Sequence, residues 1–214
     1  MNSITLDNTL PQVFLQRTDI QSDIWRRQVS FQRGETYLVE AQSGTGKSSL
    51  CSFIIGYRHD FDGHILFDGR DSRQLRTPDW IELRQRHISM LFQELRLFPE
   101  LTALENVEIK NSLTHHKTVK EIAQWFEALG IADKMDAPVR LMSFGQQQRV
   151  AMIRALVQPF DFLLADEPIS HLDDENSTMM ADIMTEEAQR QGAGIIITSI
   201  GKHMELPYDK ILKL

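Results

Sequence analysis

The segment AQSGTGKSSL, residues 41–50, has the residue types and the spacing needed to hold a chain of phosphates. It follows the pattern G-x-x-x-x-G-K-[ST], except that Ala41 stands at the first glycine position. Backbone N–H groups of residues 43–48 at the start of a helix would surround an anion, and Lys47 would add a positive charge. The Ser48 hydroxyl would ligate Mg²⁺. We therefore predict a phosphate loop at residues 41–48; the alternative is a glycine- and serine-rich turn with a surface lysine.

Ala41 adds one methyl group at the first position of the phosphate loop. The position lies at the end of a predicted strand, where the methyl is either tolerated or, if φ is positive, costs about 1 kcal/mol. Glycine is needed more strictly at Gly44 and Gly46, because phosphate must approach the backbone closely and left-handed dihedrals are resisted by a Cβ atom.

Two acidic residues end the apolar segment FLLADEP, residues 162–168. The pattern is typical of a buried strand that offers Asp166 to Mg²⁺ and Glu167 to an attacking water. Adjacent carboxylates at the end of a buried strand are otherwise costly. The segment thus predicts the hydrolytic part of a nucleotide site, and the alternative is a strand that runs into an acidic turn.

The segment SFGQQQRVAMIRAL, residues 143–156, predicts an amphipathic helix. Ser143 and Gln146 have the spacing of a capping box, in which each side chain bonds the backbone N–H of the other residue. Val150, Ile153 and Val157 share one face of the helix that follows. A helix is expected here whatever the function.

The elements that position these motifs show alternating strand and helix signals. Apolar, β-favouring runs predict strands at residues 35–40, 64–67, 87–92, 162–166 and 194–198, and helices are predicted at 48–56, 118–130, 143–156 and 173–192. Thr118 and Glu121 form a capping box at the start of the second helix, and Gly130 ends it. Trp125 and Phe126 on this helix suggest a core face or a stacking platform for bases, and the core is the commoner use.

Composition narrows the classes of protein. The chain has 214 residues, 42% hydrophobic and 25% charged, which suits a globular protein, and its formal net charge of −7 argues against nucleic acid as a main partner. The single cysteine, Cys51, indicates no internal disulfide framework, and we expect a buried thiol in a reducing compartment. The N-terminus lacks a signal-peptide pattern, and the apolar runs are far shorter than the roughly 20 residues of a membrane helix. We therefore expect a cytoplasmic protein.

In the order of its motifs, the chain resembles the ATP-binding cassette (ABC) ATPase family. The family signature L-S-G-G-Q is matched by MSFGQ, residues 142–146, and AQSGTGKSS, LFQELRLFPELTALENV and LLADEPISHLD stand in the family order around it. The resemblance covers almost the whole chain. It implies an α/β P-loop NTPase fold in one domain, residues 1–214: a RecA-like core with a mostly parallel sheet, a helical lobe at about residues 94–145 and an N-terminal β region. The residues after Gln93 most resemble those of the lipoprotein-release and macrolide-export type of ABC ATPase.

The resemblance also implies roles for the matched residues. Glu167 would polarise the attacking water, and Gln93 would touch Mg²⁺ or that water. Mg²⁺ would be held by Ser48, Gln93 and Asp166. Asp173 would couple the two sites of a dimer, and its charge also suits the start of a helix. Two cassettes would face each other head to tail, so that ATP bound to one chain is covered by the other. The nucleotide contacts would be Ala41, Ser43, Gly44, Thr45, Gly46, Lys47, Ser48, Ser49 and Asp166 of one chain and Ser143, Gly145, Gln146 and Asp173 of the other.

Three positions depart from the family pattern: Ala41, Phe144 and Ser199. Phe144 replaces the first glycine of the signature, where a large ring would weaken closure or require a shifted fit. Ser199 stands where the family has a histidine that contacts the γ-phosphate, and it offers a hydrogen bond without positive charge. His203, four residues later, is expected at the surface. The aromatic residue that stacks on adenine is missing at its expected place; Phe14 and Trp25 are weak candidates that suit the core equally.

Three function classes follow from these features. The first is an ATP-hydrolysing subunit that drives a membrane permease through ATP-dependent dimerisation, and the segment after Gln93 favours it because it resembles a permease-contacting segment. The second is a slow or non-hydrolysing ATP-binding switch of a membrane complex, motivated by the three departures. The third is a soluble cassette protein acting on DNA, ribosomes or iron-sulfur assembly. The first implies ATP and Mg²⁺ as ligands, a second copy and a permease as partners, no nucleic acid, and a place at the inner face of the cell membrane.

Overall fold

A parallel sheet of five strands lies at the centre of the computed structural model, which describes residues 1–170 and 172–214. In sheet order the strands are β6 (Ile88–Leu91), β7 (Phe162–Asp166), β8 (Gly194–Ser199), β3 (Thr36–Glu40) and β9 (Lys210–Lys213). Strands β7 and β8 are buried along their whole length, as expected for continuous apolar runs covered on both faces. The predicted parallel core is confirmed, and the strand predicted at 162–166 has the predicted bounds.

A second, antiparallel sheet is formed by the N-terminal part of the chain. Its strands are, in sheet order, β2 (Gln28–Gln32), β1 (Ser3–Pro11), β4 (Phe61–Phe67) and β5 (Arg70–Asp71). The strand predicted at 64–67 belongs here rather than to the core and begins earlier, at Phe61. Its buried Phe61, Ile65 and Phe67 alternate with more exposed residues, the pattern of a strand with one solvated face.

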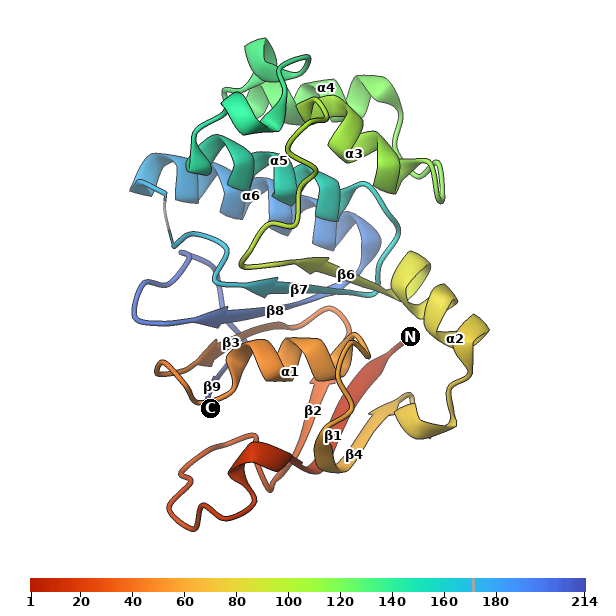
Figure 1. Cartoon of the computed structure of the whole chain (residues 1–214), viewed down its shortest axis with the longest axis vertical. Helices are drawn as coiled ribbons and strands as arrows, with labels where there is room; N and C mark the ends of the chain where they lie inside the picture. Colours follow the sequence, from red (N-terminus) through yellow and green to blue (C-terminus); the bar gives the residue numbers. More distant parts are fainter. Residues whose placement is uncertain (171) are drawn as a thin grey trace.

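Helix α1 (Lys47–Ile54) lies between the two sheets (Figure 1). Its buried Leu50, Phe53 and Ile54 share one hydrophobic core with residues of both sheets, among them Phe162 and Leu164 of β7. Cys51 is buried in this helix, and burial raises the pKa of its thiol well above the ordinary value, which disfavours the reactive thiolate form.

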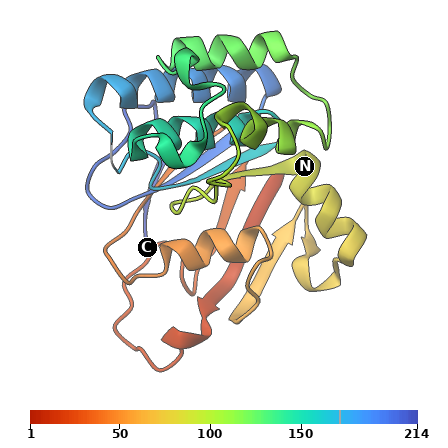
Figure 2. The same ribbon diagram turned by 45° about the horizontal axis from the view of Figure 1, so that its top comes forward.

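The opposite face of the parallel sheet is covered by helices. Helices α5 (Phe144–Leu156) and α6 (Asp174–Gln191) lie against it, and α3 (Ala103–Asn111) and α4 (Val119–Ala128) lie beyond them, while the short α2 (Thr77–Glu82) lies beside the sheet (Figures 1 and 2). The capping boxes predicted at Thr118 and Ser143 are present. Phe126 is fully buried and Trp125 packs against the same core, which confirms the core interpretation of this aromatic pair.

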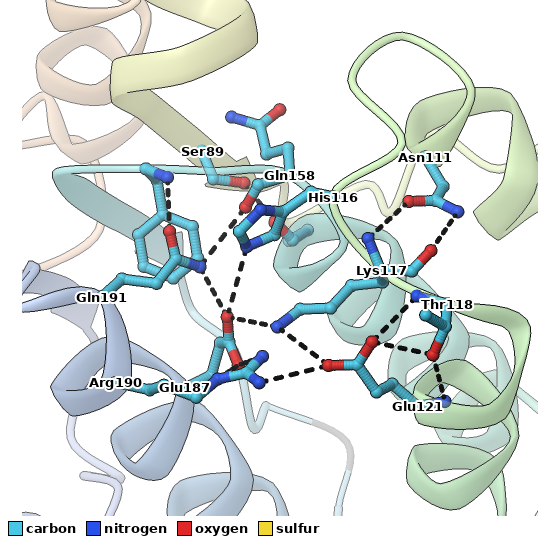
Figure 3. A network of polar contacts seen from close by, with 12 residues as sticks. Ser89, Asn111, His116, Lys117, Thr118, Glu121, Gln158, Glu187, Arg190 and Gln191 are labelled. Atoms are coloured by element: carbon cyan, nitrogen blue, oxygen red, sulfur yellow. Dashed lines mark hydrogen bonds and ion pairs between the residues drawn. The ribbon is translucent and has the colours of Figure 1, made fainter.

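A buried polar network joins the connection between α3 and α4 to α6 (Figure 3). The Lys117 amine lies 2.7 Å from the Glu187 carboxylate, and their side chains are only 1% and 3% exposed. The Asn111 side chain holds the backbone of Lys117 by two hydrogen bonds, of 3.0 and 3.1 Å. Arg190 bridges Glu187 and Glu121. The helices beyond α5 and α6 are therefore attached to the core by charge pairing as well as by apolar packing.

Candidate nucleotide-binding site

The carboxyl ends of β3, β7 and β8 bring together the segments that the sequence marked for chemistry. In the parallel pairing, Asp166 lies opposite Thr198 and Glu40 lies opposite Ser199. The phosphate loop follows Glu40 directly, so it begins beside Ser199 at the end of β8. Strand β8 separates it from β7, which ends at Asp166. Strand ends of an open α/β sheet are where such folds bind ligands.

The phosphate loop has the open face and the left-handed glycines that an anion site requires. Gly44 has a φ of +81°, and a Cβ atom built there meets nothing within 4 Å, so its backbone is accessible. Gly46 has a φ of 101° at the N-cap of α1. A Cβ at Gly46 would lie 3.2 Å from ring atoms of Phe14 and of Trp25, and the Trp25 indole donates a 2.9 Å hydrogen bond to the Thr45 carbonyl. Both rings are buried and support the loop from beneath.

The exposure and hydrogen bonds of the remaining loop residues are compatible with phosphate binding. Ser43 is exposed, and Ser48 is exposed in the first turn of α1. The Thr45 hydroxyl donates to the Gln42 carbonyl at 2.8 Å, which closes the loop on itself. The Ser49 hydroxyl accepts a hydrogen bond of 3.0 Å from Arg58, a contact that the sequence did not suggest.

Ala41 continues strand β3. Its N–H donates a 3.0 Å hydrogen bond to the Ser199 carbonyl, and Ala41 is not among the non-glycine residues with positive φ. Its methyl packs against the core around α1. Of the two alternatives raised by the sequence, tolerance is therefore the correct one, and the missing glycine introduces no backbone strain.

The Lys47 amine and the Glu167 carboxylate form an ion pair of 2.7 Å, with side chains only 8% and 13% exposed. Glu167 has a φ of +49°, a left-handed conformation that costs a non-glycine residue about 1–2 kcal/mol. The conformation is held by the Glu167 N–H, which donates to the Thr198 carbonyl at 3.1 Å. Strain of this kind is concentrated at functional sites. The carboxylate is thereby aimed at the amine of the phosphate loop.

The oxygen atoms near the strand ends suit a divalent cation. Asp166 is buried, its carboxylate accepts a hydrogen bond from the Thr198 hydroxyl, and within residues 1–170 and 172–214 it forms no ion pair. Carboxylate and hydroxyl oxygens such as those of Asp166 and Ser48 are ligands that Mg²⁺ prefers. Gln93 is exposed two residues after β6, whose Leu91 lies opposite Ala165, so Gln93 reaches the same sheet edge as Glu167.

Ser199 is buried at the end of β8, and its hydroxyl donates to the Lys202 carbonyl. The Lys202 amine donates to the Leu172 carbonyl at 2.9 Å and lies 3.0 Å from the Asp174 carboxylate. His203 lies 3.2 Å from Glu40 with a side chain 38% exposed, which agrees with the expected surface position. The loop thus provides a hydroxyl group, already bonded within the loop, where the family pattern has a histidine.

The signature residues begin α5, on the opposite face of the sheet from α1 (Figure 1). The Ser143 hydroxyl accepts from the Gln146 N–H at 3.3 Å, and the Gln146 side chain accepts from the Ser143 N–H at 2.9 Å. The Phe144 side chain is 44% exposed. No hydrogen bond joins Ser143, Gly145 or Gln146 to the phosphate loop among the residues that the structure describes. One chain therefore does not assemble the two motifs into one site.

Asp173 caps helix α6, because its carboxylate accepts from the Asn176 N–H at 2.8 Å. This bond and the Asn176 side-chain amide lower the pKa of Asp173, so its negative charge is secure at neutral pH. Arg149 of α5 donates to the Asn176 side chain at 2.7 Å and to the Leu129 carbonyl at 2.8 Å. The helix that begins with the signature is thus tied directly to the start of α6.

Three side chains of α5 connect the motifs and were missed in the sequence. Gln148 is buried and donates to the Pro168 carbonyl, directly after the acidic pair. Arg154 donates to the carbonyls of Leu95 and Arg96, in the segment after Gln93. The third is Arg149, described above. All three lie in QQQRVAMIRAL, so their place within a recognised motif was the available signal.

Comparisons with known proteins agree with this geometry. The family model described as "ABC transporter" matches residues 26–170. The uncharacterized ABC transporter ATP-binding protein YbbA of Escherichia coli (strain K12) is 30% identical over 185 residues, which cover 85% of this chain and 81% of YbbA. The macrolide export ATP-binding/permease protein MacB of Shewanella sp. (strain ANA-3) is 31% identical over 192 residues, 87% of this chain but 29% of MacB. The chain thus spans less than a third of that relative.

Solved structures of similar fold include the dimeric structure of MJ0796, described as a bacterial ABC transporter cassette. It superposes with a TM-score of 0.75 at 25% identity and covers 92% of this chain and 87% of that one. A dimeric post-hydrolysis state of the same cassette, bound to ADP and Pi, superposes with a TM-score of 0.73 at 25% identity over the same shares of the two chains.

Proposed function

The chain belongs to the ABC transporter family, and from this premise we propose that it is the subunit that binds and hydrolyses ATP to drive a transporter. The observation that carries the proposal is the Lys47 and Glu167 ion pair of 2.7 Å, because it places the charge of the phosphate loop and a strained acid in one mostly buried site. Asp166 is the neighbouring residue on β7. YbbA and MacB, which are both named as ATP-binding proteins, support the same role.

The residues divide the work of hydrolysis by their chemistry. The N–H groups of residues 43–48 would hold the phosphates, and Lys47 would exchange Glu167 for a phosphate oxygen. The released Glu167 carboxylate would then accept a proton from the attacking water. Mg²⁺, held by Ser48, Asp166 and Gln93, would neutralise negative charge on the β- and γ-phosphates.

A second copy of the chain would complete the site. The signature begins a helix of 13 residues, whose dipole favours a negatively charged ligand at this end. Because Ser143, Gly145 and Gln146 do not contact the phosphate loop of their own chain, we propose that they cover the γ-phosphate bound to a partner chain. Asp173 would lie near the same interface. The dimeric state of the two MJ0796 structures supports this arrangement.

A surface beside Gln93 is proposed to bind the permease. Phe98 is exposed, and its backbone is joined to Asn106 of α3 by hydrogen bonds of 2.7 and 3.0 Å. Tyr57 is exposed and stacks on Phe92 at 5.9 Å. A permease docked on this surface would lie close to Gln93, which we propose faces the nucleotide. None of the described helices is long and apolar enough to cross a membrane, and the permease would hold the chain at the inner face of the cell membrane.

We further propose that hydrolysis is slow. The position of the family histidine carries Ser199, whose hydroxyl donates to the Lys202 carbonyl, and the Lys202 amine is bonded elsewhere. No cation from this loop would therefore stabilise charge on the γ-phosphate. Ser199→His should raise kcat; an unchanged or lower kcat in a folded variant would contradict the proposal.

Steady-state phosphate release from Mg-ATP tests the main proposal. Release should rise more than linearly with protein concentration and should vanish in Glu167→Gln, because two chains form each site and the carboxylate is required. Release that is linear in protein concentration, or that persists in Glu167→Gln, would argue against a dimeric ATPase that uses this acid. Lys47→Ala serves as the control for contaminating ATPases.

A further inference from the structure

One lysine joins two loops at the carboxyl edge of the parallel sheet, the loop that leads from β7 to α6 and the loop that follows β8. The amine of this residue, Lys202, bonds the Leu172 carbonyl at 2.9 Å and the Asp174 carboxylate at 3.0 Å. The Asp174 side chain is 97% exposed, so the ion pair contributes little and the bond to the carbonyl is the main contact. Lys202 therefore holds the chain next to Asp173, which we propose lies near the interface of two chains.

The position of Lys202 is fixed by its own loop. Its carbonyl accepts a hydrogen bond from the hydroxyl of Ser199, which is buried at the end of β8. Its N–H donates to the Ile200 carbonyl at 2.9 Å, and Gly201 between them has a φ of +77°. A three-residue turn closed in this way is a γ-turn. The turn directs the lysine toward the loop that follows β7.

The loop after β7 is held at its start and at its end by residues of the β8 side. At the start, the Glu167 N–H donates to the Thr198 carbonyl of β8 at 3.1 Å. At the end, the Leu172 N–H donates at 3.2 Å to the carbonyl of Ile169, which belongs to the same loop. The amine of Lys202 is therefore the bond that ties the end of this loop to a neighbouring element.

We propose that Lys202 is a positioning residue, which holds Asp173 where it meets the partner chain and thereby strengthens the ATP-bound dimer. A hydrogen bond from a charged donor is stronger than one between neutral groups. A loop that is already ordered loses less conformational freedom when a partner binds. Among the residues that the structure describes, no hydrogen bond or ion pair joins Lys202 to the phosphate loop, so its effect falls on dimer formation. This role rests on the proposed ATP-dependent dimer.

Sedimentation equilibrium of the full chain with Mg-ATP tests the role in a Glu167→Gln background, in which ATP is retained. Lys202→Met should raise the dissociation constant of the dimer about tenfold, which corresponds to about 1.4 kcal/mol and to the loss of one hydrogen bond to a charged group. Lys202→Arg keeps a charged donor and should restore most of the dimer affinity. Calorimetric titration with Mg-ADP should give the same affinity in all of these variants, because the amine does not contact the phosphate loop.

Lys210→Met is the matched control. The Lys210 side chain is 51% exposed, against 46% for Lys202, and it pairs with Glu35 at 3.1 Å. Lys210 begins β9, whereas Lys213 at the other end of the strand lies opposite Glu40, the residue before the phosphate loop. The control therefore removes the same charge at the opposite end of the sheet, and it should dimerise as the Glu167→Gln parent does.

Three results would count against this role, and they differ from one another. Unchanged dimer affinity in Lys202→Met would overturn the positioning role and leave the proposed function intact. Equally weakened Mg-ADP binding in Lys202→Met, or no recovery in Lys202→Arg, would show that Lys202 supports the fold of the chain rather than the interface. A Glu167→Gln parent that stays monomeric with saturating Mg-ATP would refute the ATP-dependent dimer itself, and the role of Lys202 with it.

Discussion

Removing the charge of Glu167 should tighten nucleotide binding. The Lys47 amine lies 2.7 Å from the Glu167 carboxylate, and both side chains are mostly shielded from water, at 8% and 13% exposure. A bound phosphate chain has to draw Lys47 away from this carboxylate and also meets its negative charge. Both costs fall in Glu167→Gln, since the amide is neutral and has nearly the same size and shape.

The magnitude follows from the geometry of the pair. Two unit charges at 2.7 Å attract by about 6 kcal/mol at an effective dielectric constant of about 20. Solvation of the separated groups offsets most of this attraction, and the coupling energies of close charge pairs begin at about 1.5 kcal/mol. A neutral amide at residue 167 loses this coupling between charges. A loss of about 1.5 kcal/mol lowers the Kd about tenfold.

Calorimetric titration with Mg-ADP measures this effect without hydrolysis. Glu40→Gln is the matched control, because it removes the same charge from an acid next to the phosphate loop that pairs with His203 at 3.2 Å and not with Lys47. We expect the control to stay within about twofold of wild type. Equal or weaker binding in Glu167→Gln, or the same gain in Glu40→Gln, would refute the competition for Lys47.

Three further changes test the packing. Gly46→Ala forces alanine to a φ of 101° and brings its Cβ to 3.2 Å from Trp25, so we expect a lower Tm and loss of Mg-ADP binding; an unchanged Tm would contradict this packing. Lys117→Met removes the buried cation beside Glu187, whose other close partner, Arg190 at 2.6 Å, has a side chain that is 53% exposed. The change should lower the free energy of unfolding in urea by about 3–5 kcal/mol, with partial recovery in the double variant with Glu187→Gln; a loss below about 1 kcal/mol would contradict the buried pair. Ser143→Ala should cost about 1 kcal/mol of stability as a lost cap and leave Mg-ADP affinity unchanged; weaker Mg-ADP binding would place Ser143 in the site of its own chain.

The parts of the fold that could be predicted carry local signals. Strand β7 is a continuous apolar run. The capping boxes at Thr118 and Ser143 each pair two residues that are three positions apart, and the helix begins directly after the first of them. The sheet to which Phe61–Phe67 belongs could not be predicted, because that choice depends on pairing with β1, far away in the sequence. Strand β9 escaped prediction for the same reason: its pairing with β3 joins Lys210 to Tyr37.

The residue types of the site could be predicted from the sequence, but most of the contacts between them could not. The phosphate loop and the acidic pair were marked by spacing, whereas the ion pair between Lys47 and Glu167 depends on the order of strands. The tolerance of Ala41 depended on its backbone dihedral, which no sequence pattern fixed. The bond from Ser199 to the Lys202 carbonyl depends on the path of one loop. Backbone conformation and long-range pairing therefore decided what composition and motifs left open.

A mixing experiment tests the composite site most directly. Lys47→Ala keeps the signature and loses the phosphate loop, while Gly145→Asp keeps the loop and places a negative charge in the signature. Each variant alone should release no phosphate from Mg-ATP, and a mixture of the two should recover part of the wild-type rate, because a mixed head-to-tail dimer contains one intact site. A mixture that stays inactive at every ratio, while wild type is active, would contradict a site shared between two chains.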